Sequence, residues 1–267
     1  MKTAVEFKNI KKAYGDKVVM EGFNLSIEKG EFITIIGSSG CGKTTALKMV
    51  NGLIQPTEGE IFVDGENIRS KDQTQLRRNI GYAIQGSVLF PHMTVEQNIA
   101  YVPNLLNKWD KEKTRGAVSK WMKIVGLSEE LKYRYPSELS GGQQQRVGIA
   151  RALAASPDIL LMDEPFGAVD EITRGQLQTE MKQIHEQTGI TVLFVTHDIS
   201  EALKLGTKVL VMSSGKIEQF AKPEDLLRSP ATEFVKGLVR KSAAPIRCSA
   251  VDFLVIPEIS QAIFPTY

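Results

Sequence analysis

The stretch Gly37-Ser-Ser-Gly-Cys-Gly-Lys43-Thr44-Thr45 decides the fold of this chain, because it carries the pattern G-x-x-x-x-G-K-[ST]. A β-prone apolar run at 32–36 precedes it, and a helix-prone run at 46–53 follows it. Glycines let the backbone wrap closely around a phosphate chain, and the N-terminus of the next helix adds a positive end. In such loops the lysine binds the β- and γ-phosphates, and the hydroxyl that follows it binds Mg²⁺. We therefore predict that a nucleoside triphosphate is bound by Gly37, Ser38, Ser39, Gly40, Cys41, Gly42, Lys43, Thr44 and Thr45.

Length and composition indicate one large α/β domain with a substantial core. The 267 residues suffice for such a domain and a small appendage. The formal net charge of +2 shows no basic bias, so we expect no nucleic-acid partner. Cys41 lies inside the phosphate-binding loop, where a disulfide would obstruct the site, and this favours a reducing compartment. No apolar run approaches the roughly 18 residues of a membrane span. We expect a cytoplasmic protein whose membrane role comes through a partner.

Hydrophobic patterns predict two kinds of sheet. Short β-prone runs with turns at 15–16 and 29–30 predict antiparallel strands at the start of the chain, joined by a strand at 60–63. Two strongly apolar strands lie at 159–162 and 191–195, with a helix-prone segment between them. Because a β-α-β succession places its strands side by side in one direction, we predict a parallel core sheet.

The middle of the chain is helical in pattern. The helical periodicity runs from 94 to 131 and includes Trp109 and Trp121, which we interpret as packing residues. A further helix begins at Ser140.

Two carboxylates follow the apolar strand at 159–162. Asp163, at the end of this strand, can hold Mg²⁺ directly or through water, as phosphoryl-transfer sites require. Glu164 points elsewhere and can polarise the attacking water as a general base. Two solvated acids at an exposed strand end are the ordinary alternative. The phosphate-binding loop earlier in the chain favours the catalytic interpretation.

The segment Ser140-Gly141-Gly142-Gln143 allows two interpretations. Ser140 followed by Gln143 makes a capping box at the start of a helix. A cap does not need two glycines in the first helical positions, where they weaken the helix. Positions without side chains and with bare N–H groups suit the close approach of an anion. We therefore interpret the segment as a second phosphate-contacting element, in addition to its capping role.

Four segments together resemble the nucleotide-binding subunit of an ATP-binding cassette transporter: the phosphate-binding loop, Leu-Ser-Gly-Gly-Gln-Gln-Gln-Arg at 139–146, Met-Asp-Glu-Pro at 162–165 and Thr-His-Asp at 196–198. The resemblance implies an α/β fold with a P-loop NTPase core, a mixed parallel sheet, an antiparallel β subdomain and an inserted α-helical subdomain at about 87–155. It places the nucleotide-binding domain at 1–240. The tail at 241–267 matches nothing that we can place.

The resemblance assigns roles to four further residues. Tyr14 resembles the aromatic residue that stacks on adenine. Gln85 resembles the glutamine that touches Mg²⁺ and water and relays the nucleotide state to the membrane subunit. Asp170 resembles the aspartate at the dimer interface, although the usual leucine before it is Val169 here. His197 resembles the histidine that reaches the γ-phosphate. The expected catalytic residues are then Glu164, His197 and Gln85, and the expected Mg²⁺ ligands are Thr44, Gln85 and Asp163.

The resemblance also implies partners. Two copies would pair head to tail, with each ATP between the loop at 37–45 of one subunit and 140–143 of the other. ATP binding would close this homodimer and hydrolysis reopen it. The motion would drive transmembrane permease subunits, served by an extracytoplasmic solute-binding protein, from the cytoplasmic face of the membrane. The coupling surface would lie around 85–98, where exposed apolar residues would fit a partner's coupling helix.

Within this family, the segments 76–85, 90–94, 101–105 and 166–174 are similar to subunits that serve importers of quaternary amines: glycine betaine, choline, carnitine and related osmoprotectants. Many such subunits continue into a paired cystathionine-synthase-type module linked to ionic strength. Because this sequence stops at Tyr267, the resemblance leaves open whether osmotic gating through such a module occurs. The alternatives are a non-transport cassette protein of translation or DNA repair, and the cassette of an importer or exporter for a different solute.

Overall fold

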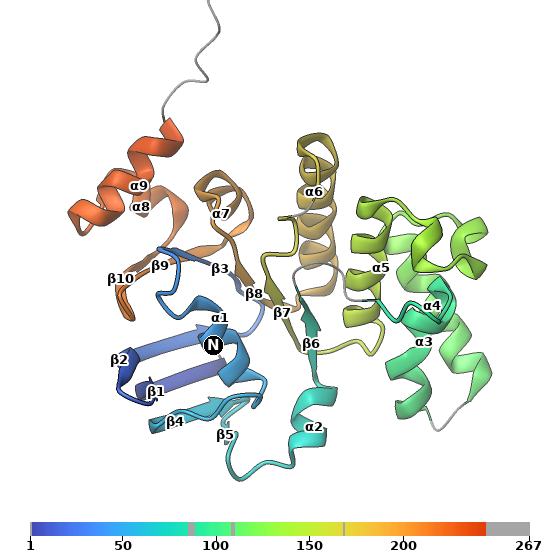
Figure 1. Ribbon diagram of the computed structural model, residues 1–267, viewed down its shortest axis with the longest axis horizontal. Helices are drawn as coiled ribbons and strands as arrows, with labels where there is room; N and C mark the ends of the chain where they lie inside the picture. Colours follow the sequence, from blue (N-terminus) through green and yellow to red (C-terminus); the bar gives the residue numbers. More distant parts are fainter. Residues whose placement is uncertain (1, 85–88, 108–109, 168, 244–267) are drawn as a thin grey trace, which may run out of the picture.

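The computed structural model describes residues 2–84, 89–107, 110–167 and 169–243. Within these residues two sheets form the framework (Figure 1). The larger sheet has the order β10-β9-β3-β8-β7-β6 and is parallel except for the antiparallel pair β9 and β10. Its strands are β3 (Phe32–Gly37), β6 (Ile80–Ala83), β7 (Ile159–Asp163), β8 (Thr191–Val195), β9 (Lys208–Ser213) and β10 (Lys216–Ala221).

The central strands β9, β3, β8 and β7 are largely apolar, as is typical of parallel strands that are covered on both faces. Alternate residues of β7 point to opposite sides: Leu160 and Met162 belong to one buried cluster, and Ile159 and Leu161 belong to another. This arrangement confirms the predicted parallel core sheet. The expected α/β architecture, with a P-loop-type core, an antiparallel sheet and inserted helices, is also confirmed.

The smaller sheet is antiparallel, with the order β2-β1-β4-β5. Its strands are β1 (Thr3–Tyr14), β2 (Lys17–Glu28), β4 (Glu58–Val63) and β5 (Glu66–Asn67). The sequence indicates several short runs at the start of the chain, but the structure has two strands of 12 residues each. Irregular register between them lets the strands continue past residues that break the alternation of apolar and polar side chains.

Helix α1 (Lys43–Val50) lies between the two sheets, because it contacts strands of both. The apolar residues Leu47, Met49 and Val50 on this helix are completely buried. The connection continues through α2 (Gln73–Arg78), which Asp72 caps by accepting a hydrogen bond from the N–H of Gln75. The phosphate-binding loop is therefore held between a core strand and a buried helix.

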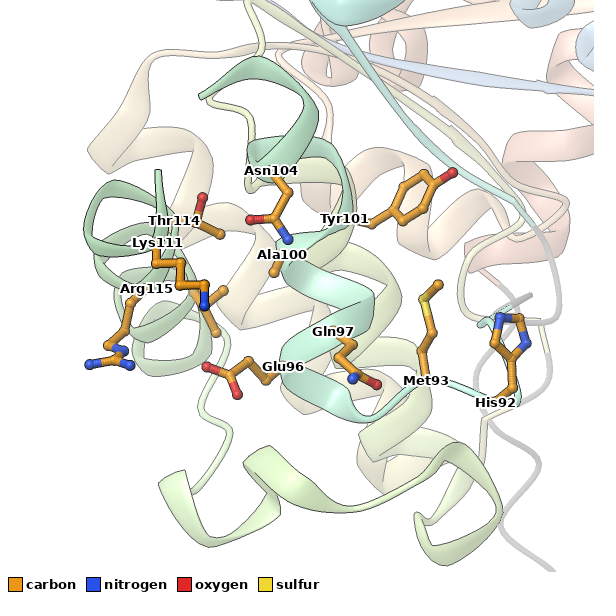
Figure 2. Close-up of a pocket in the computed structure, with 11 residues that line it drawn as sticks. His92, Met93, Glu96, Gln97, Ala100, Tyr101, Asn104, Lys111, Thr114 and Arg115 are labelled. Carbon is orange, nitrogen blue, oxygen red and sulfur yellow. The ribbon is translucent and has the colours of Figure 1, made fainter. Parts of the chain in front are cut away.

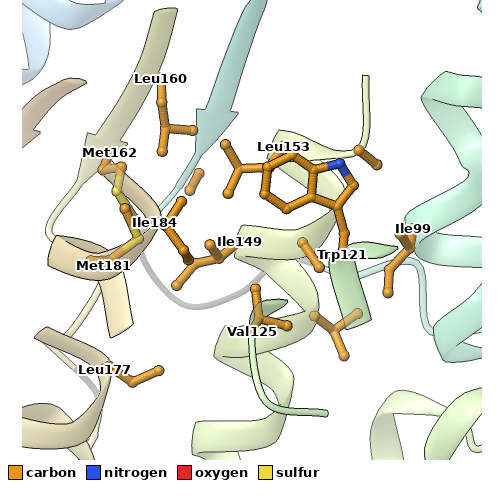
Figure 3. Close-up of a cluster of buried hydrophobic side chains, with 14 of the residues drawn as sticks. Ile99, Trp121, Val125, Ile149, Leu153, Leu160, Met162, Leu177, Met181 and Ile184 are labelled. Atoms are coloured by element: carbon orange, nitrogen blue, oxygen red, sulfur yellow. The ribbon is translucent and has the colours of Figure 1, made fainter. Parts of the chain in front are cut away.

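The inserted helices form a group beside β6 (Figure 1). They are α3 (Val95–Leu106), α4 (Lys111–Ile124), the short 3-10 turns η1 (Glu129–Tyr133) and η2 (Pro136–Glu138), and α5 (Gly141–Leu153). Side chains of α3, α4 and α5 share one apolar cluster with β7 and with α6 (Glu171–Thr188), as Figure 3 shows. Trp121 lies in this cluster, which confirms its packing role, whereas Trp109 lies outside the described residues.

The remaining helices cover the other end of the core sheet. They are α7 (Ile199–Leu205), α8 (Pro223–Arg228) and α9 (Glu233–Ala243). Ala202, Leu226 and Val235 of these helices pack in one buried cluster with Ile36, Val209 and Val211 of β3 and β9. Among the described helices, none is long and apolar enough to cross a membrane.

Candidate active site

The phosphate-binding loop connects β3 directly to α1. Gly37 must be glycine, because an added Cβ would lie 2.0 Å from the carbonyl oxygen of Met212 on the neighbouring strand. Gly42 caps α1 in a left-handed conformation with φ 103°. The Nζ of Lys43 donates hydrogen bonds to the carbonyl oxygens of Gly37 (2.9 Å) and Ser38 (3.0 Å), so the ammonium is held against the loop. This geometry places one cation and the N-terminus of α1 where the sequence predicts a phosphate site.

The loop meets the end of β7 through two predicted metal ligands. The hydroxyl of Thr44 donates a hydrogen bond of 3.0 Å to Oδ1 of Asp163, although 119 positions separate them in sequence. Burial raises the pKa of the Asp163 carboxyl above its usual value, while the hydrogen bond from Thr44 opposes the shift. Two hard oxygen donors side by side fit the preference of Mg²⁺.

The raised pKa of Asp163 has a consequence for stability. An ionised carboxylate that is harder to keep charged in the folded protein destabilises that state at neutral pH. We therefore expect Asp163→Asn to raise Tm in the absence of nucleotide and divalent cations. The gain should shrink as the pH falls through the raised pKa, because Asp163 itself is then neutral. Calorimetric scans over a pH series measure it.

Asp170→Asn provides the control of opposite sign. The N–H of Thr173 donates to the Asp170 carboxylate and lowers its pKa, so the ionised form is favoured in the folded state. This variant should not raise Tm at neutral pH. A lower Tm in Asp163→Asn than in the unmodified chain would contradict the prediction.

Glu164 and His197 face each other across the ends of β7 and β8. The backbone of Glu164 turns left-handed with φ 45°, which is unusual for a residue with a side chain, and its N–H donates to the carbonyl of Val195 at 3.0 Å. Oε2 of Glu164 lies 3.5 Å from Nδ1 of His197. The carboxylate is partly buried, while the imidazole is mostly exposed. The two predicted catalytic side chains are therefore brought together, next to Asp163.

The capping box predicted at the start of α5 is confirmed. The hydroxyl of Ser140 accepts from the N–H of Gln143 (3.3 Å), and Oε1 of Gln143 accepts from the N–H of Ser140 (2.9 Å). Among the described residues, no hydrogen bond or ion pair joins this segment to the phosphate-binding loop of the same chain. Figure 1 shows α1 and α5 on different sides of β7 and β6.

One of the two glycines in this segment is explained by packing within the chain and not by an approaching anion. An added Cβ at Gly142 would lie 2.6 Å from Cγ2 of Thr173, so this glycine has a packing reason inside the chain: it lets α5 approach the start of α6. An added Cβ at Gly141 would meet nothing within 4 Å. The inference that glycine there serves an approaching anion therefore depends on Gly141 alone. The phosphate-contacting role of the segment stays a prediction.

The nucleotide and interface roles predicted for three other residues have no direct test in the structure. Tyr14, at the end of β1, has an exposed ring with Nζ of Lys12 4.7 Å from its centroid. Asp170 is the N-cap of α6, a structural role that accounts for its position without a dimer. Gln85 lies outside the described residues. The assignments of Tyr14 to adenine, of Asp170 to a dimer interface and of Gln85 to Mg²⁺ stay predictions.

Of the predicted coupling surface at 85–98, residues 85–88 lie outside the described part of the chain, and residues 89–98 contain fewer exposed apolar side chains than expected. Leu89 and Val95 are 7% and 1% exposed, because they belong to the apolar cluster of the inserted helices. Exposed apolar side chains lie nearby instead, at Ile84 and Tyr101. A groove of about 510 Å³ runs along α3 and α4. In Figure 2, Lys111 lies on one side of α3 in this groove, and Tyr101 lies on the other.

Asn98 organises this surface, and the sequence pattern alone did not single it out. Its side chain is completely buried and accepts a hydrogen bond from the N–H of Phe90 at 2.8 Å. Its Nδ2 lies within hydrogen-bonding distance of the carbonyls of Phe90 (3.2 Å), Met93 (3.0 Å) and Thr94 (3.0 Å). One amide therefore closes the loop that precedes α3.

We expect Asn98→Ala to destabilise the fold by about 2–3 kcal/mol, because buried backbone groups lose their partners and a cavity is left. Denaturant unfolding measures the change, and limited proteolysis should show cleavage in the loop before α3. Asn104→Ala on the same helix is the matched control and should change stability by no more than about 0.5 kcal/mol. Equal effects from the two variants would contradict the role given to Asn98.

A buried polar cluster beside His197 was also missed. Thr196 and Gln178 each donate a hydrogen bond to Glu201 behind the site. The signal available in the sequence was weak, because a glutamate two residues into a short helix and a glutamine within a longer one are common on helix surfaces. Only the packing of α6 against α7 shows that they are buried.

Comparison with known proteins defines the class of this chain. Residues 20–167 match the family model described as ABC transporter. The chain belongs to the ABC transporter family. Its nucleotide-site segments and its two-sheet fold are those that the resemblance predicts, so the family assignment made from the sequence is confirmed.

Particular relatives narrow the comparison. The choline transport ATP-binding protein OpuBA of Bacillus subtilis (strain 168) is 52% identical over 253 residues, which cover 94% of this chain and 66% of OpuBA. The glycine betaine/carnitine/choline transport ATP-binding protein OpuCA of the same organism is 50% identical over 238 residues, covering 89% of this chain and 62% of OpuCA. The chain thus spans less than two thirds of the length of either relative.

A solved structure agrees with the fold. The dimeric post-hydrolysis structure of the ATP-binding cassette MJ0796, bound to ADP and Pi, superposes with a TM-score of 0.73 at 36% sequence identity. The match covers 82% of this chain and 98% of MJ0796.

Proposed function

We propose that this chain is the ATP-hydrolysing subunit of a membrane importer for quaternary-amine osmoprotectants such as glycine betaine, choline and carnitine. One observation carries the ATPase part: the hydrogen bond of 3.0 Å between Thr44 and Asp163, beside the facing side chains of Glu164 and His197. It joins a phosphate-binding loop to a carboxylate strand end and a base, the parts that phosphoryl transfer to water requires.

Each side chain has a stated task in this proposal. Lys43 binds the β- and γ-phosphates, and Thr44 and Asp163 hold Mg²⁺, with Gln85 as a further ligand. Bound Mg²⁺ neutralises charge on the phosphate oxygens. Glu164 orients the attacking water and accepts its proton. His197 donates a hydrogen bond to the γ-phosphate, and the carboxylate of Glu164 at 3.5 Å keeps its imidazole near the reacting atoms.

The site is proposed to be shared between two copies of the chain. Ser140–Gln143 of one copy would complete the phosphate site of the other, which is supported by the separation of α1 and α5 within one chain (Figure 1). Gly141 offers open space to an incoming phosphate. The dimeric state named for MJ0796 adds support. Tyr14 would stack on adenine, and Asp170 would lie at the interface.

The permease is proposed to dock along the surface that Asn98 organises, on the cytoplasmic face of the membrane. Support comes from the groove along α3 and α4 (Figure 2) and from the exposed Ile84 and Tyr101 beside it. A partner with an apolar helix flanked by acidic side chains would match Lys111 and Arg115 on the groove wall. An extracytoplasmic solute-binding protein would deliver the solute to that permease.

The solute class is supported by the names of two relatives. OpuBA is named a choline transport ATP-binding protein, and OpuCA is named a glycine betaine/carnitine/choline transport ATP-binding protein. The deciding experiment reconstitutes the chain with its permease subunits and solute-binding protein in vesicles. ATP hydrolysis should rise when the binding protein is loaded with choline, carnitine or glycine betaine, and should not rise with sulfate or proline. Stimulation by sulfate alone would replace the solute assignment while keeping the ATPase.

A further inference from the structure

A buried polar cluster joins the loop of His197 to two helices. Thr196, Gln178 and Glu201 are 2%, 8% and 5% exposed, respectively. The hydroxyl of Thr196 donates to Oε2 of Glu201, and Nε2 of Gln178 donates to Oε1 of the same carboxylate at 3.0 Å. Each oxygen of Glu201 is therefore used, and each by a different element: the end of β8 and the middle of α6.

The charge of Glu201 is compensated indirectly. Nζ of Lys204 donates to Oε1 of Gln178 at 2.9 Å, and the other end of that amide donates to Glu201. A flipped amide would place its oxygen against the carboxylate and its NH₂ against the ammonium, so one orientation is strongly favoured. A buried carboxylate without such partners would be costly. The hydrogen bonds therefore converge on Glu201, from Lys204 through Gln178 on one side and from Thr196 on the other.

The chain of hydrogen bonds ends on the backbone that carries His197. The hydroxyl of Thr196 also accepts from the N–H of Asp198 at 3.0 Å, so one hydroxyl holds the residues on both sides of His197. The space enclosed near Glu164, His197 and Glu201 is only about 10 Å³, room for no more than about one water. The cluster therefore fixes the backbone on both sides of His197 while the imidazole itself stays mostly exposed.

The other end of the cluster is attached to α6. This helix begins next to Asp170, and its Arg174 donates from Nη2 to the carbonyl of Val169 at 3.1 Å. Gln178, one turn further along the same helix, is the residue that contacts Glu201. Side-chain hydrogen bonds therefore connect α6 to the loop of His197 through Gln178, Glu201 and Thr196.

We propose that Glu201 is a positioning residue for ATP hydrolysis: it holds the His197 loop against Glu164 through Thr196, and couples that loop to α6 through Gln178. This inference rests on the proposed function, because its predicted effect is on the rate of ATP hydrolysis. Glu201 is buried, and both of its carboxylate oxygens accept hydrogen bonds from protein side chains. The carboxylate should therefore affect kcat and leave nucleotide affinity nearly unchanged.

A reversal of the pair tests the inference. In Glu201→Gln, the new amide cannot accept from both Thr196 and Gln178, and Gln178 cannot flip without facing Lys204. In Glu201→Gln/Gln178→Glu, every contact has a partner again: Thr196 donates to the amide oxygen at 201, the amide nitrogen at 201 donates to the carboxylate at 178, and Lys204 donates to that carboxylate. The double variant therefore restores every hydrogen bond of the cluster, with the carboxylate at position 178 and the amide at position 201.

For the reconstituted transporter, we expect Glu201→Gln to lower kcat on the order of 10- to 100-fold, as misplacement by about 1 Å can do, with ATP affinity changed by less than about threefold. The double variant should recover kcat to within about threefold of the unmodified chain. Glu224→Gln, the same change at an exposed position on α8, should leave kcat unaltered. If Glu201→Gln does not fold, Thr196→Val is used in its place: it removes the hydrogen bond to Glu201 together with the one from the N–H of Asp198.

Unchanged kcat in folded Glu201→Gln, or no recovery in the folded double variant, would overturn the inference. A loss of Tm without loss of kcat would leave only a structural role and would overturn it too.

A second readout is independent of ATPase activity. The chain has three histidines, so the His197 imidazole signal can be assigned by NMR with His197→Gln. It should shift in Glu201→Gln and return in the double variant.

If the unmodified chain hydrolyses no ATP, the proposed function fails and the NMR comparison still decides the positioning role. An imidazole signal that ignores both substitutions would refute it.

Discussion

Glu164→Gln is expected to lower kcat for ATP hydrolysis by roughly 100- to 10,000-fold, because the group that accepts the proton of the attacking water is lost. The affinity for ATP should change little, since Lys43, Thr44 and Asp163 keep their places. Glutamine has the shape of glutamate and tolerates the left-handed backbone at this position equally well, so the fold is expected to persist. ATP should then hold two copies together.

Steady-state hydrolysis, ATP binding and sedimentation with and without ATP measure these three effects. Glu224→Gln is the matched control, because it removes the same charge from an exposed position on α8. Hydrolysis by Glu164→Gln at a rate close to that of the unmodified chain would remove Glu164 from the role of general base. Loss of ATP binding instead of turnover would assign it to the nucleotide-binding surface.

A mixed dimer should show the second large effect. Lys43→Ala is placed in one copy and Gly141→Asp in the other. Lys43→Ala removes the cation from the phosphates, and Gly141→Asp brings a carboxylate toward them. Each homodimer then has both shared sites damaged and should be nearly inactive. The mixed dimer has one site with both lesions and one intact site, so it should regain hydrolysis and trap nucleotide.

The structure makes Gly141→Asp the suitable second variant. The added side chain meets nothing within 4 Å in its own chain, and a carboxylate in the first turn of α5 favours the helix. Gly116→Asp on α4, where an added Cβ also meets nothing, is the control and should not affect either homodimer. Verified mixed dimers without rescued turnover and without trapped nucleotide would refute the shared site. Nucleotide trapping guards against a requirement for two active sites per cycle.

Binding to a permease distinguishes a transport function from the other candidate functions. A cassette of translation or DNA repair would keep Thr44, Asp163 and Glu164 for ATP but would not associate with a permease. Retention on a detergent-solubilised permease, and loss of that retention in Asn98→Ala, would favour transport. Retention that is insensitive to Asn98 would place the permease contact elsewhere on the chain.

The candidate site could be predicted from the sequence to the extent that its parts are local. The glycine pattern before Lys43, the capping box at Ser140 and the apolar strand before Asp163 each arise from backbone preferences within a few residues. The capping box forms as expected, and the β-α-β order leads to the parallel sheet that brings strand ends together. Local patterns also explain the main wrong prediction about the fold. They indicate several short strands at the start of the chain, where the structure has two strands of 12 residues each.

What the tertiary structure alone decided are the contacts between segments far apart in the chain. Thr44 meets Asp163 across 119 positions, Gly142 is required by Thr173 on another helix, and Gln178 meets Glu201 across 23 positions. Polar residues on helices are ordinarily exposed, so no periodicity distinguishes a buried glutamate from a solvated one. Burial is set by which helix packs on which face, and that choice depends on the whole apolar core. The sequence by itself therefore determined the phosphate-binding loop, the carboxylate strand end and the family, whereas the support behind His197 emerged only when α6 and α7 were packed together.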